Sequence, residues 1–83
     1  MKTSPFVGEI IAFFPGDNEV IVKEEGVHLA AIVTYVHTHE KINCVVYDYS
    51  GQPKPLSSIP FFLNKPVNHI PQSHARPLNY DQA

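Results

Sequence analysis

Apolar and polar residues alternate most clearly in the middle of the chain, over residues 28–36 and 42–47. In the first segment the alternate apolar positions are Leu29, Ala31, Val33 and Tyr35. In the second they are Ile42, Cys44 and Val46. A period of two is typical of half-buried β-strands, and two such segments joined by a short polar connection predict a β-hairpin.

Three further short strands are predicted, over residues 7–14, 19–25 and 56–62. These segments contain β-branched or aromatic residues, and stretches with proline, glycine, aspartate or asparagine separate them, as is typical of turns. Pro60 has no N–H to donate to a neighbouring strand, so the last of them is expected at a sheet edge. No segment has a helical period of useful length.

Four or five short strands with turns between them predict an all-β fold. The expected architecture is a small SH3-like barrel of four to five short antiparallel strands, formed by residues 1–63. An OB-like barrel is the alternative, although the strands are short and few for it. Residues 64–83 contain Pro66, Pro71 and Pro77 among polar residues, and this composition predicts an extended C-terminal arm.

Composition narrows the class of protein. Of the 83 residues, 43% are hydrophobic and 17% are charged, which is too apolar for a disordered chain. No apolar run approaches the roughly 20 residues of a membrane span, and the N-terminus does not resemble a signal peptide. The lone Cys44 cannot form an internal disulfide, and a net charge of −2 argues against a protein that coats nucleic acid. These features indicate an intracellular or virion-type globular module.

Catalytic and metal-binding patterns are weak. His37, His39 and Glu40 could supply metal ligands from the hairpin connection, but histidines at this spacing are common in hairpin loops, and we favour a solvated turn. Cys44 lies on the apolar face of a predicted strand, where a thiol is unreactive. No cofactor is predicted, and we expect a protein without enzymatic activity.

Nucleic-acid binding is an alternative, because small barrels can stack bases on aromatic side chains. Tyr35, Tyr47 and Tyr49 are candidates for such stacking. The adjoining turns supply only Lys41 and Lys54, so we expect these tyrosines to complete the core and its rim instead.

Two features indicate contact with another protein: the C-terminal segment and the adjacent pairs Phe13-Phe14 and Phe61-Phe62. Alternation turns one member of each pair outward, and a polar extended arm can lie along a partner through spaced apolar residues. The candidate partner-binding residues are Phe14, Phe62, Ile70, Leu78 and Tyr80.

The order of these motifs resembles small phage and prophage proteins. Those proteins have a G-x-I-V-x-Y strand, then A-A-I-V-T-x-V, a short loop, V-N-L-x-V-F/L, a glycine-containing turn and an S-V-P-Y strand. The matching positions here are Gly8, Ile10, Ala30 to Thr34, Val36, Ile42, Asn43, Val45, Val46, Gly51 and Ser58 to Phe61. Many of those proteins end in a tryptophan-bearing segment, which this chain lacks. The resemblance implies a viral origin and a compact β-barrel, and it carries over no catalytic or binding residue.

These observations together predict a non-enzymatic bacteriophage structural protein. The expected role is a small capsid decoration (cement) protein or minor virion protein that docks on a larger assembly, with capsid or other virion subunits as partners. The alternative is an early phage accessory protein that binds and inhibits or redirects a host protein. The expected location is the virion or the host cytoplasm, and a homo-oligomer remains open.

Overall fold

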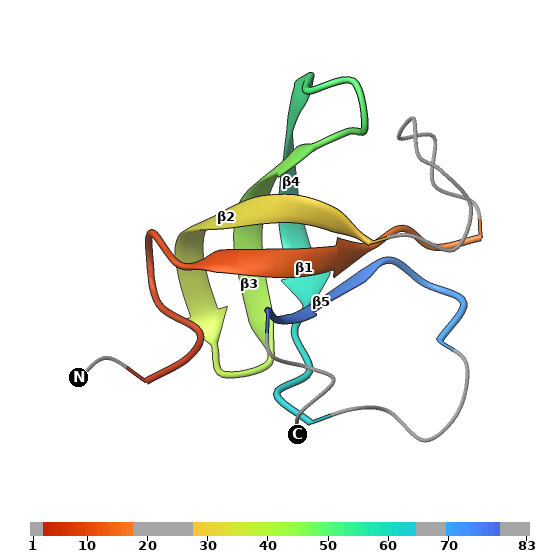
Figure 1. Ribbon diagram of the computed structural model, residues 1–83. Helices are drawn as coiled ribbons and strands as arrows, with labels where there is room; N and C mark the ends of the chain where they lie inside the picture. Colours follow the sequence, from red (N-terminus) through yellow and green to blue (C-terminus); the bar gives the residue numbers. More distant parts are fainter. Residues whose placement is uncertain (1–2, 18–27, 65–69, 79–83) are drawn as a thin grey trace.

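The described part of this computed structural model contains five β-strands, all in one antiparallel sheet (Figure 1). The structure describes residues 3–17, 28–64 and 70–78. The strands are β1 (Ile10–Phe14), β2 (Leu29–Thr38), β3 (Lys41–Tyr47), β4 (Pro53–Pro60) and β5 (His74–Pro77). Their order across the sheet is β4-β3-β2-β1-β5.

The two outermost strands meet, so the sheet curves into a barrel-like shape. Phe61, which follows β4, forms a parallel bridge with Ala75 of β5, and the Phe62 N–H donates to the Ala75 carbonyl at 2.9 Å. The radius of gyration is 11.7 Å, close to the roughly 12 Å expected for a folded chain of this length. The predicted all-β fold of short antiparallel strands is therefore confirmed.

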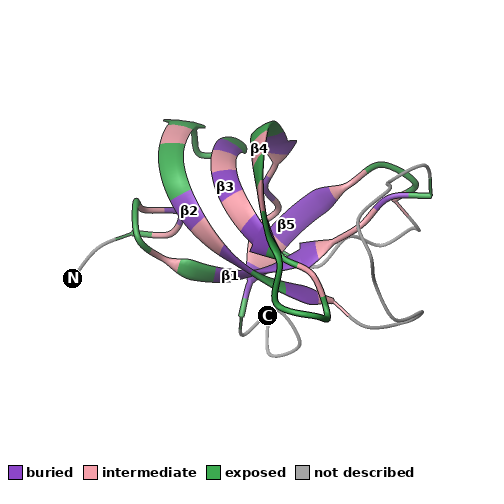
Figure 2. Cartoon of the chain, turned by 90° about the horizontal axis from the view of Figure 1, so that it is seen from above, coloured by how far each residue is buried: buried purple, intermediate pink, exposed green. Residues whose placement is uncertain are grey.

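A single hydrophobic core fills the inside of this curved sheet. Every strand contributes to it, and the largest fully buried side chains are Phe13, Phe61, Ile11, Ile42, Val33, Val46 and Cys44. Buried and more exposed positions alternate along β2 and β3, as Figure 2 shows. The alternation follows from the pleat of a strand, which sends successive side chains to opposite faces.

The predicted hairpin is confirmed, with one correction in its first strand. β2 pairs with β3 through Ala31–Val46 and Val33–Cys44, which places the predicted apolar faces together in the core. Tyr35 was expected on that face, but its side chain is 54% exposed. The register between the strands shifts between Val33 and Tyr35, and such a bulge turns the following residues to the other face.

A second irregularity lies where β3 pairs with β4. Ile42 pairs with Ile59 but Cys44 pairs with Leu56, so β4 carries an extra residue here. Ser58 in this bulge has a φ of 54°, in the left-handed region. The Asn43 side-chain oxygen accepts the Ser58 N–H at 2.9 Å. This bond satisfies a backbone donor in the bulge, where the regular pairing of β3 with β4 is interrupted.

The C-terminal arm expected over residues 64–83 is corrected by β5. This strand pairs with β1 from Ile11–Pro77 to Phe14–His74, and Ala75 is fully buried. Pro77 has no backbone N–H. It is compatible with this position because β5 is an outermost strand, whose outer side needs no N–H to pair with a further strand. Among the described residues, those after the predicted boundary at residue 63 include a strand of the same sheet, so they do not form a separate arm. The strand predicted at residues 19–25 lies outside the described residues.

Candidate functional site

An apolar row crosses the outer side of the sheet. Ile10 of β1 pairs with Ile32 of β2, Ile32 pairs with Val45 of β3, and Val45 pairs with Pro55 of β4. Their chain neighbours Ile11, Ala31, Val33, Cys44 and Val46 are buried in the core. Because side chains alternate across a sheet, the row faces away from that core.

A second row runs beside the first, two positions along each strand. Ala12 pairs with Ala30, Ala30 with Tyr47, and Tyr47 with Pro53. We call the two rows together the outer face; its members are Ile10, Ala12, Ala30, Ile32, Val45, Tyr47, Pro53 and Pro55. On the far side of Ala12, Arg76 of β5 is the next partner in the row.

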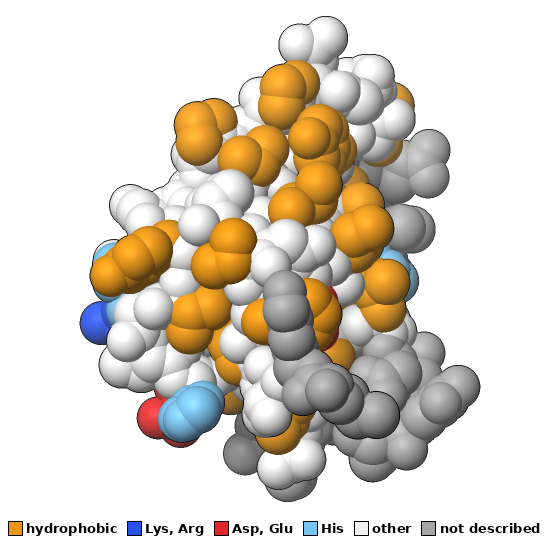
Figure 3. Space-filling view, turned by 90° about the vertical axis from the view of Figure 1, so that its left-hand side faces the viewer, with side chains coloured by type: hydrophobic (Ala, Val, Ile, Leu, Met, Phe, Trp, Pro, Cys, Tyr) orange, Lys and Arg blue, Asp and Glu red, His pale blue; other side chains and the backbone are white. Residues whose placement is uncertain are grey.

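The outer face carries no charged residue. Ile10 is 54% exposed and Tyr47 is 36% exposed, and Ala30, Pro53 and Pro55 are also exposed. Ile32 and Val45 are half-buried, and Ala12 is fully buried, so the open part of the outer face lies on either side of Ala12. In the space-filling view of Figure 3, hydrophobic side chains spread over much of one side of the molecule, and charged side chains there are few. Contiguous exposed apolar surface of this kind is typical of a contact site for another protein.

The outer edges of the sheet are poorly suited to binding an added strand. β4 contains Pro53, Pro55 and Pro60, and β5 ends at Pro77. A proline has no N–H, and within sheets it occupies edge positions where the missing donor faces away from the neighbour. Such edges resist strand addition. A partner is therefore expected to contact the face of the sheet.

The turn between β3 and β4 follows Tyr47, the last residue of β3, and contains Tyr49. The Asp48 carboxylate accepts the Ser50 N–H at 3.0 Å, the Ser50 hydroxyl at 2.8 Å and the Gln52 N–H at 2.9 Å. The Ser50 hydroxyl, followed by the Gln52 N–H, lowers the pKa of Asp48. The turn is thus fixed by an ionised carboxylate, and Tyr49 beside it is 61% exposed.

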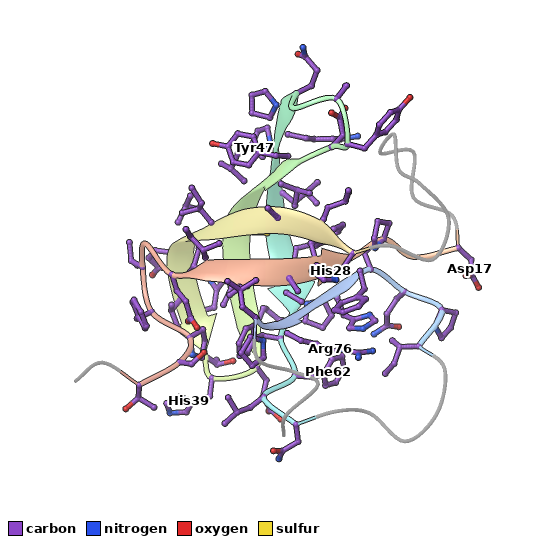
Figure 4. All side chains as sticks on the ribbon, in the orientation of Figure 1. Asp17, His28, His39, Tyr47, Phe62 and Arg76 are labelled. Carbon is purple, nitrogen blue, oxygen red and sulfur yellow. The ribbon has the colours of Figure 1, made fainter. Side chains whose placement is uncertain are left out.

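An aromatic and cationic cluster lies where β1 and β5 meet; we call it the Phe14 cluster, formed by Phe14, His28, Phe62, His74 and Arg76. Phe14 stacks on His74 at 5.1 Å between ring centroids, and the Arg76 guanidinium carbon lies 4.2 Å above the Phe14 ring. Phe62 meets His74 edge-on at 5.5 Å, and His28 lies 5.6 Å from Phe14. In the view of Figure 4, Phe62 and Arg76 lie below β5 and His28 lies above them.

The predicted partner-binding residues are not brought together into one exposed site. Phe14 and Phe62 point away from the core as expected, but both are half-buried because they pack around His74. Ile70 is half-buried, and Leu78 is 55% exposed. Tyr80 lies outside the described residues. Two of the five residues thus hold β5 in place.

The structure separates the histidines of the hairpin connection. His37 bonds through Nε2 to the Asn43 side-chain oxygen at 2.8 Å and meets Tyr35 edge-on at 4.8 Å. His39 and Glu40 instead line an open groove of about 410 Å³ with Phe61, Phe62 and Leu63, among others. Within residues 3–17, 28–64 and 70–78, no three His, Cys, Asp or Glu side chains are grouped to hold a metal ion.

Cys44, the single thiol of the chain, is 1% exposed. Burial raises the pKa of its thiol to about 11, so the nucleophilic thiolate is disfavoured at neutral pH. In the described part of the chain, no helix is long and apolar enough to cross a membrane.

Sequence reasoning missed both the outer face and the Phe14 cluster. A signal for the outer face was present, because IIAFF and LAAIV are apolar at successive positions, so both faces of those strands are apolar. The register that aligns Ile10, Ile32 and Val45 is a tertiary property, however. The Phe14 cluster depends on the pairing of β1 with β5, for which HARP offers no alternating pattern.

Comparisons with models of known protein families, with curated proteins and with solved structures found no match.

Proposed function

We propose that this chain is a non-enzymatic docking protein of a bacteriophage particle, a small decoration (cement) or minor virion protein that contacts a larger assembly through its outer face. The observation that carries the proposal is the uncharged row Ile10–Ile32–Val45–Pro55 on the outside of the sheet. The phage assignment is supported by the sequence resemblance described above. A capsid or another virion subunit is the proposed partner, and the virion or host cytoplasm the proposed location.

The size of the outer face favours a repeated contact. Neighbouring strands lie about 4.8 Å apart and alternate side chains about 7 Å apart, so four strands and two rows span a few hundred Å². A standard stable interface buries about 800 Å² on each partner. A single contact through this face is therefore expected to be weak. Copies that also contact one another on a symmetric shell would link such weak contacts, and linked contacts hold more tightly than each one alone.

The first experiment is mass spectrometry of banded virions from the source phage, with copy number measured against the major capsid protein. A simple ratio to capsid supports decoration, and a few copies per particle support a tail or portal component. Absence from the particle overturns the structural role. It leaves a host-directed accessory protein as the alternative.

A binding experiment tests the surface itself. Capsids lacking the protein are incubated with purified wild type, Ile10→Lys or Tyr47→Lys, whose side chains are exposed enough that folding should be retained. We expect each variant to lose at least tenfold in occupancy, because a buried unpaired charge opposes docking. Asn64→Lys, an exposed position on the chain between β4 and β5, is the control that should bind normally. Equal binding by all variants would exclude the outer face.

A further inference from the structure

A patch of hydrogen-bond donors lies at one end of the outer face. Lys41 and Asn43 lie on the side of β3 that faces away from the core, in line with Val45, because the residues between them are buried. Tyr35 is the cross-strand partner of Asn43 and is 54% exposed. His37 meets the Tyr35 ring edge-on at 4.8 Å between centroids. We call Tyr35, His37, Lys41 and Asn43 the donor patch.

The Asn43 side chain is held in one orientation. The atom 2.9 Å from the Ser58 N–H must be its oxygen, because a backbone N–H can only donate. The same oxygen lies 2.8 Å from His37 Nε2, which therefore donates to it. The Asn43 amide nitrogen has no partner in the described part of the chain. No buried side-chain nitrogen or oxygen there lacks a partner, so this nitrogen is open to solvent.

Lys41 and Tyr35 add two further donors next to the Asn43 amide. Lys41 is exposed and forms no ion pair with any described residue. Glu40, its neighbour in the chain, lines the open groove beside Phe61 instead. Directly opposed Cα atoms of antiparallel strands lie about 5 Å apart, and alternate Cα atoms of one strand about 7 Å apart. The ends of the three donor side chains can therefore meet at one small group.

We propose that the donor patch binds an aspartate or glutamate carboxylate of the protein that docks on the outer face. The inference rests on the proposed docking role of the outer face and specifies the chemistry of the partner. An ionised carboxylate has two acceptor oxygens, so it can accept hydrogens from an amide, an ammonium and a phenol together. Such bonds are charge-assisted and stronger than neutral ones. The matching surface of the partner is an apolar patch bordered by an acidic residue.

A nucleic-acid phosphate offers similar acceptor oxygens, but the surroundings of the donor patch favour a protein. Affinity for nucleic acid comes mainly from several cations on successive phosphates. Lys41 is the one lysine or arginine of the donor patch, and the row Ile10–Ile32–Val45–Pro55 beside it has no charge. An apolar surface with a polar margin is typical of protein–protein contacts.

An NMR titration with two peptides tests the carboxylate site. The probes are acetyl-Leu-Asp-Leu-Asp-Leu-amide and the same peptide with asparagine in place of both aspartates, so that both offer leucines to the outer face. We expect the aspartate peptide to bind about fivefold more tightly and to shift the signals of the Asn43 side-chain amide. Equal affinity for the two peptides would overturn the proposal.

Three variants show whether the donor patch causes this preference. Asn43→Asp keeps an oxygen for the Ser58 N–H but replaces the donor with a charged acceptor, and it should abolish the preference. Lys41→Gln removes the ammonium and should reduce it. Lys54→Gln is the matched control, because Lys54 pairs with the buried Val46 and so lies on the other side of the sheet. An unchanged preference in Asn43→Asp and Lys41→Gln, or an equal loss in Lys54→Gln, would contradict the site.

The inference and the proposed function can fail separately. Normal capsid binding by Ile10→Lys would count against the outer face, whereas equal affinity for the two peptides would count against the donor patch alone. A short oligothymidylate added to the same protein tests the nucleic-acid alternative. We expect it to bind more weakly than the aspartate peptide, and equal or tighter binding would overturn the assignment to a protein carboxylate.

Discussion

Val33 and Tyr35 lie two positions apart in β2, yet Val33 is 1% exposed and Tyr35 is 54% exposed. In a regular strand both side chains would share a face. The shift in pairing with β3 between the two residues separates them, so one side chain enters the core and the other reaches solvent.

Alanine substitutions at these two positions should lower the free energy of unfolding by different amounts. Val33→Ala removes fully buried methyl groups and should lower the free energy of unfolding by about 2 kcal/mol. Tyr35→Ala should cost less than about 1 kcal/mol, since it loses mainly an exposed edge contact with His37. Urea denaturation of both variants measures the difference, and equal losses would contradict the bulge.

Asn43 should stabilise the bulge in β4 through its side-chain oxygen. That atom accepts the Ser58 N–H at 2.9 Å, and His37 Nε2 lies 2.8 Å from it. Asn43→Ala should lower the free energy of unfolding by about 1–2 kcal/mol, because the Ser58 donor loses its acceptor. Asn43→Asp keeps an acceptor oxygen at this position and should retain more of the stability. A larger loss in the aspartate variant than in the alanine variant would show that the acceptor is not what matters.

Gly16 is a position at which a side chain cannot be added. A Cβ there would lie 2.5 Å from the Ser73 nitrogen and 2.6 Å from the Pro71 carbonyl oxygen, both backbone atoms of the segment leading into β5. Gly16→Ala should lower the free energy of unfolding by about 2–3 kcal/mol through this overlap.

Gly51→Ala is the matched comparison for Gly16→Ala. Gly51 has a φ of 88°, and a Cβ there meets nothing within 4 Å, so its cost is backbone strain of about 1–2 kcal/mol. Thermal unfolding and amide exchange at Phe62 measure both variants. Gly16→Ala should reduce the protection of Phe62 more than Gly51→Ala does, and the reverse order would contradict the contact with β5.

The Cys44 thiol should make stability depend on alkaline pH. Burial raises its pKa from 9.0 to about 11, so the unfolded chain loses this proton at a lower pH than the folded protein does. The contribution is fully present below pH 9 and is lost as the pH rises toward 11, by up to about 1.4 kcal/mol per pH unit. The difference in urea stability between wild type and Cys44→Ala should shrink from pH 8 to pH 10. A constant difference would contradict the shift, as would rapid reaction of the folded thiol with Ellman's reagent.

Local sequence pattern was enough to predict the central strands and their buried faces. Ile42, Cys44 and Val46 occupy alternate positions, and burying them together requires β3 to lie with that face inward. The short polar connection before them requires an antiparallel neighbour, which is β2. Both inferences rest on local periodicity, which a single sequence displays directly.

The role of the C-terminal segment depends on its contacts in the folded protein. HARP is short, ends in proline and has no alternation, so it becomes a strand because β1 offers an edge from about sixty residues away in the chain. The same pairing buries His74 against Phe14 and Phe62. The alignment of Ile10, Ile32 and Val45 into one row likewise depends on register, and hence on bulges whose positions are set by packing across strands.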